Sequence, residues 1–487
     1  MPNNLQGHLF IIAPAGSIDS PLIVPNQSDK ISNSSKSELT EEPDNIEYIV
    51  LPSKDGCTSL INGNGMIYRI DFNNCHAHLS SKIIKNLSYF VDKIAHKKYP
   101  NLKFINCGLV RLSYQLGICD FANTGLISVK FSKENRERLL VTWDAGRPYE
   151  IDPYSLKIIA PIGLNKDWND LIKLPFTVPF RPIMSSTHPC FDYKTDEMFT
   201  VNIVKSLETL LGELIDLKSF LFVLLKNLVK LNNKKYTQNL PANKSIQIGI
   251  ALVIKVFFCF TKTFSTMFNM FNLGREDGVY LVRWNGLNSI QKWKLVLPNG
   301  CPIKIKQSIH QIGLTEKYVI LVDTSFKVAL KTFIPALKDG WLKEIGKIGK
   351  KLGLNRNHLT RPQLSDTHIY IVSRDQLNDL TVGEPIKVKQ VKLQREIGHF
   401  LVDYDNPQEK ITLHAALNCA TDVPEFIHST DSSIFQEPEV NQNLRSLAGF
   451  FHSSMDINRL AMYVIDGKTG KKHKEEIVSL KESREYS

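Results

Sequence analysis

Short β-strand patterns recur along this 487-residue chain and constrain its fold more than any other feature. From about residue 47 onward, apolar and β-branched residues alternate or cluster in short runs, each bounded by Gly, Asn, Asp or Pro. Representative runs are 66–72, 125–131, 138–144, 278–285, 318–326, 368–374 and 399–406. Many short strands joined by turns predict an all-β protein with a repeated architecture, such as a β-propeller.

The turns 151–157, 191–198 and 465–472 resemble one another, although the repeats have no fixed length. The chain is longer than the roughly 250–300 residues at which a simple core stops growing. Either two or three ordinary domains or one large repetitive architecture accounts for that length, and the similar turns favour the second. We predict a single propeller domain over residues 1–487, with a flexible loop at the Ser- and Asn-rich residues 26–45.

An apolar helical insertion is predicted over residues 203–275. Its segments 206–231 and 245–273 combine helical spacing with dense Leu, Ile and Phe. Lysines interrupt both segments, so neither contains the roughly 20 apolar residues of a membrane span. The two segments fit either a surface that docks on a bilayer or a helical cap that packs on the propeller.

A basic amphipathic insertion is predicted over residues 329–360. Within it, the helix 341–354 has an apolar face and a lysine-rich face, a pattern typical of a helix that lies in a membrane interface. The residues expected to bind the membrane are Trp341, Ile345, Ile348, Lys347, Lys350 and Lys351. A cap that packs its apolar side on the propeller is the alternative.

The composition is that of a folded protein with a positive surface. Hydrophobic residues make up 43% of the chain and the formal net charge is +11. A face that binds single-stranded nucleic acid needs aromatic residues interleaved with basic ones on its strands. Here, Lys and Arg are spread along the sequence without that pattern. We therefore predict no nucleic-acid partner. The first residues have no basic region followed by a long apolar run, so we predict a cytoplasmic protein.

Three histidines stand at the ends of predicted strands. His188 precedes Pro189, which disfavours helix at the histidine, while His310 precedes an apolar strand and His414 follows β-forming residues. Each could be a structural or surface histidine. In a propeller, however, the innermost strand of every blade points at one central channel, where such histidines can meet. Neutral imidazoles suit iron, copper, zinc and nickel.

Six segments, in the same order along the chain, resemble the carotenoid cleavage oxygenase family, which includes retinoid isomerases and stilbene-cleaving enzymes. These segments are 4–16, 62–72, 138–159, 185–202, 308–323 and 399–426. The resemblance implies a seven-bladed β-propeller with a helical cap. It also implies one non-haem Fe2+ per chain, bound on the propeller axis by four histidines and no carboxylate, with O2 as co-substrate.

Three of the implied iron ligands map onto His188, His310 and His414. Asp144 falls where the family commonly has a glutamate that orients a ligand histidine. Because aspartate is one methylene shorter, we expect its contact to need a shifted backbone or a bridging water. The alternative is a turn aspartate that ends a strand. Asp422 and Glu425 are expected on the surface.

The resemblance also implies a fourth histidine and further strands after residue 487. His428, His452 and His473 lie in contexts that do not match it. We therefore predict an incomplete propeller that is truncated at its C-terminus, whether as a fragment, as a half completed by a separate chain, or as a decayed paralogue.

The predicted function is that of an iron dioxygenase that oxidatively cleaves a conjugated C=C bond of a carotenoid or apocarotenoid. Its substrate would be an apolar polyene, and the protein would associate peripherally with the membrane surface, where lysines meet anionic headgroups. Isomerisation in place of cleavage stays open. The alternative is a truncated, non-catalytic, membrane-associated propeller of the same family.

Overall fold

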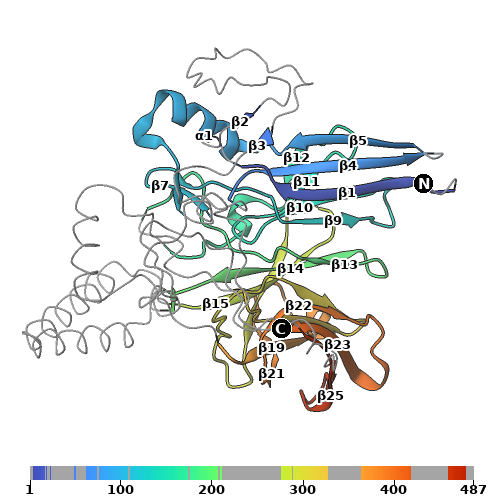
Figure 1. The fold of residues 1–487 in the computed structure, drawn as a ribbon. Helices are drawn as coiled ribbons and strands as arrows, with labels where there is room; N and C mark the ends of the chain where they lie inside the picture. Colours follow the sequence, from blue (N-terminus) through green and yellow to red (C-terminus); the bar gives the residue numbers. More distant parts are fainter. Residues whose placement is uncertain are drawn as a thin grey trace, which may run out of the picture.

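A computed structural model shows a fold made mostly of β-strands (Figure 1). The structure describes residues 4–16, 18, 22–23, 49–50, 62–73, 76–107, 110–173, 176–206, 209–210, 276–287, 289–326, 364–417 and 459–478. This part of the chain confirms the predicted all-β class. The loop 26–45 and the basic insertion 329–360, with its predicted membrane-binding residues, lie outside the described residues. The insertion 203–275 also lies outside them, apart from 203–206 and 209–210, and its first two residues end a strand.

Four sheets contain four or five strands each, and apart from the short strand Ile386–Lys387 their strands come from consecutive parts of the chain. In Figure 1 they follow the β1–β4–β5 sheet in chain order, from blue to red. The first contains β9 (Gly125–Val129), β10 (Arg138–Thr142), β11 (Tyr149–Ile151) and β12 (Ile158–Pro161). The second contains β13 (Cys190–Asp192), β14 (Glu197–Val204), β15 (Gly278–Trp284), β16 (Gln291–Val296) and β20 (Ile386–Lys387). The third contains β17 (Ile312–Leu314), β18 (Tyr318–Val322), β19 (Thr367–Ser373) and β21 (Lys389–Leu393). The fourth contains β22 (Ile397–Val402), β23 (Lys410–Leu417), β24 (Arg459–Asp466) and β25 (Lys472–Val478).

The N-terminal part of the chain contributes smaller sheets and one longer helix. The strands are β1 (Gly7–Pro14), β4 (Gly65–Asn73) and β5 (His76–Ile83) in one sheet, β6 (Ile105–Cys107), β7 (Val110–Ser113) and β8 (Gly117–Ile118) in another, and the pair β2 (Leu22–Ile23) and β3 (Ile49–Val50). In the part of the chain that the structure describes, the helices are α1 (Leu87–Lys98) and α7 (Gln376–Asp379), with 3-10 turns at Pro100–Leu102, Asn165–Asp167 and Pro407–Glu409. None of the helices among the described residues is both long enough and apolar enough to cross a bilayer.

Apolar side chains fill the space between successive sheets. All five residues of β18 are buried. Val319 and Leu321 pack in the core shared with the second sheet, whereas Ile320 and Val322 pack in the core shared with the fourth. Because successive side chains of a strand point to opposite faces, a sheet covered on both faces needs an uninterrupted apolar run. The sequence YVILV meets that requirement.

The first strands of three sheets contact one another in succession, since β13 contacts β17 and β17 contacts β22. The two hydrogen bonds that join the first pair run from the His188 N–H to the His310 carbonyl (3.1 Å) and from the Ile312 N–H to the His188 carbonyl (3.3 Å). The residues just before β13 and β17 are therefore held side by side.

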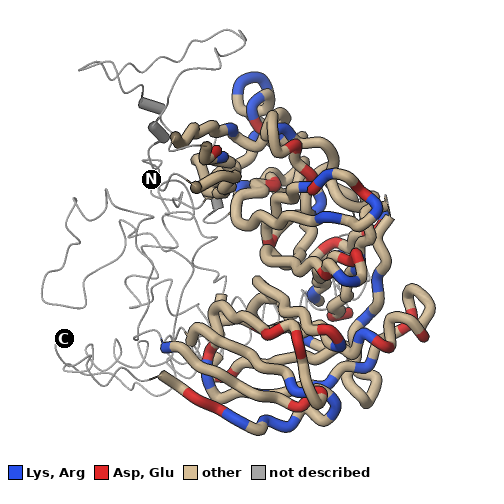
Figure 2. Tube along the Cα trace, turned by 90° about the vertical axis from the view of Figure 1, so that its right-hand side faces the viewer, with Lys and Arg blue, Asp and Glu red and all other residues tan. Residues whose placement is uncertain are grey.

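A buried ion pair ties the same three sheets together. The carboxylate of Asp192, at the end of β13, lies 2.6 Å from Nη1 of Arg374, which follows β19. The same carboxylate accepts a hydrogen bond from the hydroxyl of Tyr404, which follows β22. Elsewhere, positive and negative side chains are interspersed over the described residues (Figure 2).

Candidate metal centre

Three imidazoles, each within or next to a different sheet, meet in one place. They belong to His188, His310 and His399, and one nitrogen of each lies within 4.8 Å of the corresponding nitrogens of the other two. The ring centroids are 4.9 Å apart for His188 and His310, 5.6 Å for His188 and His399, and 5.2 Å for His310 and His399. His310 is buried and His399 is exposed, so the cluster extends from the interior to an accessible surface.

The backbone before β13 fixes the first two imidazoles. Besides the two bonds between the segments, the hydroxyl of Ser186 donates to the carbonyl of His310 at 3.0 Å. Pro189 keeps His188 in an extended conformation. The His188–Pro189 pair, which predicted an extended backbone, thus lies where hydrogen bonds join the second sheet to the third.

Asp144 contacts His310 directly. Its Oδ2 lies 2.8 Å from Nδ1 of His310, while its Oδ1 accepts hydrogen bonds from the N–H (3.1 Å) and the hydroxyl (2.5 Å) of Thr187. The shorter aspartate therefore reaches the ring without a bridging water. Because a carboxylate accepts at Nδ1, that nitrogen carries the proton and Nε2 keeps its lone pair.

Gln311 plays the corresponding role for His399. Its side-chain N–H donates to the carbonyl of Phe400, which turns Oε1 toward Nδ1 of His399 at a distance of 3.0 Å. Nδ1 of His399 therefore donates, and Nε2 keeps its lone pair. The sequence analysis did not identify this glutamine, which directly follows His310.

Burial and mutual repulsion set the charge of the cluster. Burial, with smaller contributions from His310 and His399, lowers the pKa of His188 to about 4. Burial and then His310 lower the pKa of His399 as well. Burial also opposes protonation of His310, but the Asp144 carboxylate outweighs it and raises the His310 pKa. At neutral pH, His188 and His399 are thus neutral imidazoles able to donate a lone pair.

Phe326 lies against the cluster. Its ring centroid is 4.5 Å from that of His310 and 5.0 Å from that of His399. The ring therefore shields one side of both imidazoles from water.

His414 does not belong to this cluster, which corrects the sequence prediction. It lies on β23, where its exposed ring contacts Asp403 at 3.2 Å. The apolar residues Ile411, Leu413 and Ala415 alternate with it and are buried, so His414 points to the opposite face of the sheet. The third imidazole is that of His399, which begins one of the segments that carried the resemblance.

The donor set fits a metal ion such as iron. Three imidazoles converge, two of them have Nδ1 bonded to an oxygen, and imidazole is a common ligand of first-row transition metals. Among the described residues around the cluster, no carboxylate takes part as a ligand. His473 lies apart on β25, with Nε2 3.8 Å from Asp466. Asp422, Glu425, His428 and His452 lie outside the described residues.

Comparison with known proteins gives one family match. The model of the family described as retinal pigment epithelial membrane protein matches residues 45–213, which include Asp144 and His188. This match confirms the predicted resemblance to the carotenoid cleavage oxygenase family. No curated protein matches the sequence with significance.

Two solved structures are among those to which the chain is similar. Cobalt-substituted Synechocystis apocarotenoid oxygenase is 14% identical, with a TM-score of 0.45, over 98% of this chain and 67% of its own. Pseudomonas brassicacearum lignostilbene dioxygenase is 13% identical, with a TM-score of 0.45, over 97% of this chain and 64% of its own. The chain thus spans about two thirds of the length of these proteins.

Proposed function

We propose that this protein is a non-haem Fe2+ dioxygenase, because residues 45–213 match the model of the family described as retinal pigment epithelial membrane protein. It cleaves a conjugated C=C bond of a carotenoid or apocarotenoid with O2 as co-substrate. The observation that carries the proposal is the convergence of His188, His310 and His399 within 4.8 Å. When bound, the iron would supply the redox chemistry that the protein's own side chains lack.

The side chains of this chain would bind and orient the metal. His188, His310 and His399 hold it, while Asp144 and Gln311 fix the tautomer and direction of two of the rings. The resemblance implies a fourth imidazole, and the described part of the chain brings three together. The proposed architecture is a seven-bladed propeller, incomplete at its C-terminus, in which the four- and five-stranded sheets would be blades.

The proposed substrate is an apolar polyene taken from a membrane. The protein would be cytoplasmic and would associate with the bilayer through Trp341, Ile345, Ile348, Lys347, Lys350 and Lys351. Replacing Ile345 and Ile348 by glutamate should release it from vesicles that contain anionic lipid. Sedimentation of this double variant with vesicles to the same extent as the wild type would refute that role.

Metal analysis tests the proposed function most directly. We expect the purified chain to contain iron, and we expect His188→Ala, His310→Ala and His399→Ala each to lose most of it. His414→Ala is the matched control, because its exposed ring lies outside the cluster and its removal should leave the iron content unchanged.

Activity is the second readout. Incubation of the iron-loaded chain with an apocarotenoid under O2 should give two carbonyl products, separable by chromatography, and the three cluster variants should give none. A wild-type chain that binds no iron would contradict the dioxygenase and favour the non-catalytic propeller.

A further inference from the structure

The turn that carries Asp144 is held from one side by Ser185. This turn, residues 144–147, follows β10 and leads into β11. The Ser185 N–H donates to the carbonyl of Asp144 at 2.9 Å. Its hydroxyl lies 3.1 Å from the carbonyl oxygen of Trp143 and 2.6 Å from that of Gly146. Ser185 thus fixes the turn to the segment that contains His188.

Asp120 holds the same turn from its other side. A Cβ atom added to Gly146 would lie 2.4 Å from Oδ2 of Asp120, so the carboxyl packs directly on this glycine. Against the effect of burial, the nearby Tyr149 hydroxyl and the Arg147 side chain and backbone favour the ionised form of Asp120 and lower its pKa. Its Oδ1 accepts a hydrogen bond from the N–H of Ala122 at 3.1 Å.

The backbone of Asp120 is anchored to the start of α1. Its N–H donates to the Ser88 hydroxyl at 3.1 Å, and its carbonyl accepts from the Asn86 amide at 2.7 Å. Asn86 in turn caps α1 by accepting from the N–H of Tyr89 at 3.0 Å. A continuous series of contacts therefore runs from α1 through Asp120 and the turn to His310.

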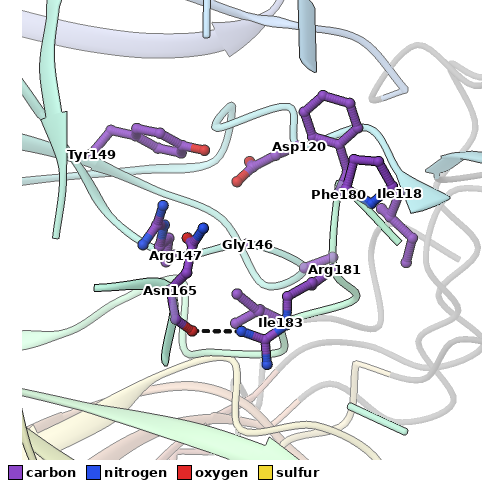
Figure 3. A pocket seen from close by; sticks show the side chains of 11 residues that line it. Ile118, Asp120, Gly146, Arg147, Tyr149, Asn165, Phe180, Arg181 and Ile183 are labelled. Atoms are coloured by element: carbon purple, nitrogen blue, oxygen red, sulfur yellow. Dashed lines mark hydrogen bonds between the residues drawn. The ribbon is translucent and has the colours of Figure 1, made fainter. Parts of the chain in front are cut away.

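A small pocket lies beside Asp120 (Figure 3). Tyr149 and Arg147 also line it, but the charged groups of the pocket already have protein partners. Arg147 donates to the carbonyl of Gly163 at 3.0 Å, and Arg181 contacts Asp170 and the Trp168 carbonyl. These contacts indicate that the charged side chains around the pocket have a structural role and do not form a ligand site.

Burial raises the pKa of Asp120 to about 7, because it disfavours the ionised form of the carboxyl. The carboxyl nevertheless packs directly on the turn at Gly146. Catalytic and metal sites need such support to hold their ligands in place.

We propose that Asp120 is a positioning residue for the histidine cluster, which holds the turn 144–147 so that the Asp144 carboxylate faces Nδ1 of His310. This inference rests on the proposed function, because it concerns the orientation of a proposed metal ligand. Asp120 itself would touch neither metal nor substrate.

The first test replaces Asp120 by asparagine and measures Co2+ binding to the purified chain through its visible absorption. We expect the affinity to fall about 10–100-fold, as for the loss of other groups that orient metal ligands, and the spectrum to change. Asp92→Asn is the matched control. It removes another buried carboxyl, paired with Arg111 at 2.9 Å, and should lower the melting temperature without changing Co2+ affinity.

The second test uses Gly146, and it keeps the proposal falsifiable if Asp120→Asn fails to fold. Gly146→Ala places a methyl group against the Asp120 carboxyl and should weaken Co2+ binding to a similar degree. In an Asp120→Ala background that clash is gone, so the double variant should bind Co2+ as Asp120→Ala alone does.

The outcomes separate the two proposals. A wild-type chain that binds no Co2+ would overturn the proposed function and this inference with it. A wild-type chain that binds Co2+, with Asp120→Asn and Gly146→Ala binding equally well, would overturn the positioning role alone.

Discussion

Oδ2 of Asp144 lies 2.8 Å from Nδ1 of His310, and the two residues lie next to different sheets and are 166 positions apart in the sequence. The hydroxyl and N–H of Thr187 hold the other carboxylate oxygen. The pair therefore fixes both the tautomer of His310 and the direction of its Nε2 lone pair.

Replacing Asp144 by asparagine should weaken metal binding about 10–100-fold, because an amide is a weaker acceptor for the Nδ1 proton. Titration with Co2+, followed by visible absorption, measures the change. Asp144→Glu should retain more of the affinity, since it keeps the carboxylate. Equal affinity of the asparagine variant and the wild type would show that Asp144 does not orient a ligand.

Phe326 should control the basicity of the exposed imidazole. Its ring lies 5.0 Å from that of His399, and burial is the main cause that lowers the His399 pKa. Phe326→Ala admits water and should raise that pKa toward its ordinary value, whereas Phe326→Leu should change it less. NMR titration of the histidine ring protons in the metal-free protein, with His399→Asn for assignment, measures the shift. An unchanged pKa in the alanine variant would contradict the shielding role.

The strands were predictable because their signals are local. Each of the seven runs named from the sequence overlaps a strand, for example 278–285 with β15 and 368–374 with β19. The run 318–326 was predicted too long, since β18 ends at Val322. There the Asp323 carboxylate accepts the N–H groups of Lys306 and Gln307, a long-range contact that no local pattern reveals. The parallel pairing of β16 with β20 is equally non-local.

The site was predictable only where a local signal marked it. His188 and His310 stand at strand starts, and the structure brings them together. His414 was misassigned although the alternation of ITLHAAL places it opposite the buried residues. His399 is harder to identify, because a register shift between Ile397 and His399 re-aims the side chains of β22.

Acidification should destabilise the metal-free protein through His188. Its folded pKa is about 4, against the ordinary histidine pKa of 6.5, so the unfolded chain binds more protons between these values. The stability that this group contributes is complete above pH 6.5 and is lost as the pH falls toward 4. His310, whose pKa is raised, acts in the opposite sense and loses its contribution as the pH rises through its folded pKa.

Urea unfolding at pH 7 and pH 4 isolates the contribution of His188 when the wild type is compared with His188→Asn. Between pH 7 and pH 4, the free energy of unfolding of the wild type should fall by about 2–3 kcal/mol more than that of the variant, because a shift of one pKa unit corresponds to about 1.4 kcal/mol. Parallel pH profiles for the two proteins would contradict a buried, neutral His188.

The ion pair between Asp192 and Arg374 should be essential for stability. Both side chains are buried, and the pair joins β13 to the end of β19 with Nη1 and Oδ2 2.6 Å apart. Asp192→Asn removes the nearer of two carboxylates and leaves the guanidinium only the contact with Glu197 at 3.3 Å, so the free energy of unfolding should fall by up to about 3–5 kcal/mol. Glu276→Gln is the control, because Glu276 is 81% exposed where it contacts Lys294, and its loss should cost less than about 1 kcal/mol. Chemical denaturation measures the free energy of unfolding of both variants. Equal small losses would contradict a stabilising role of the buried ion pair.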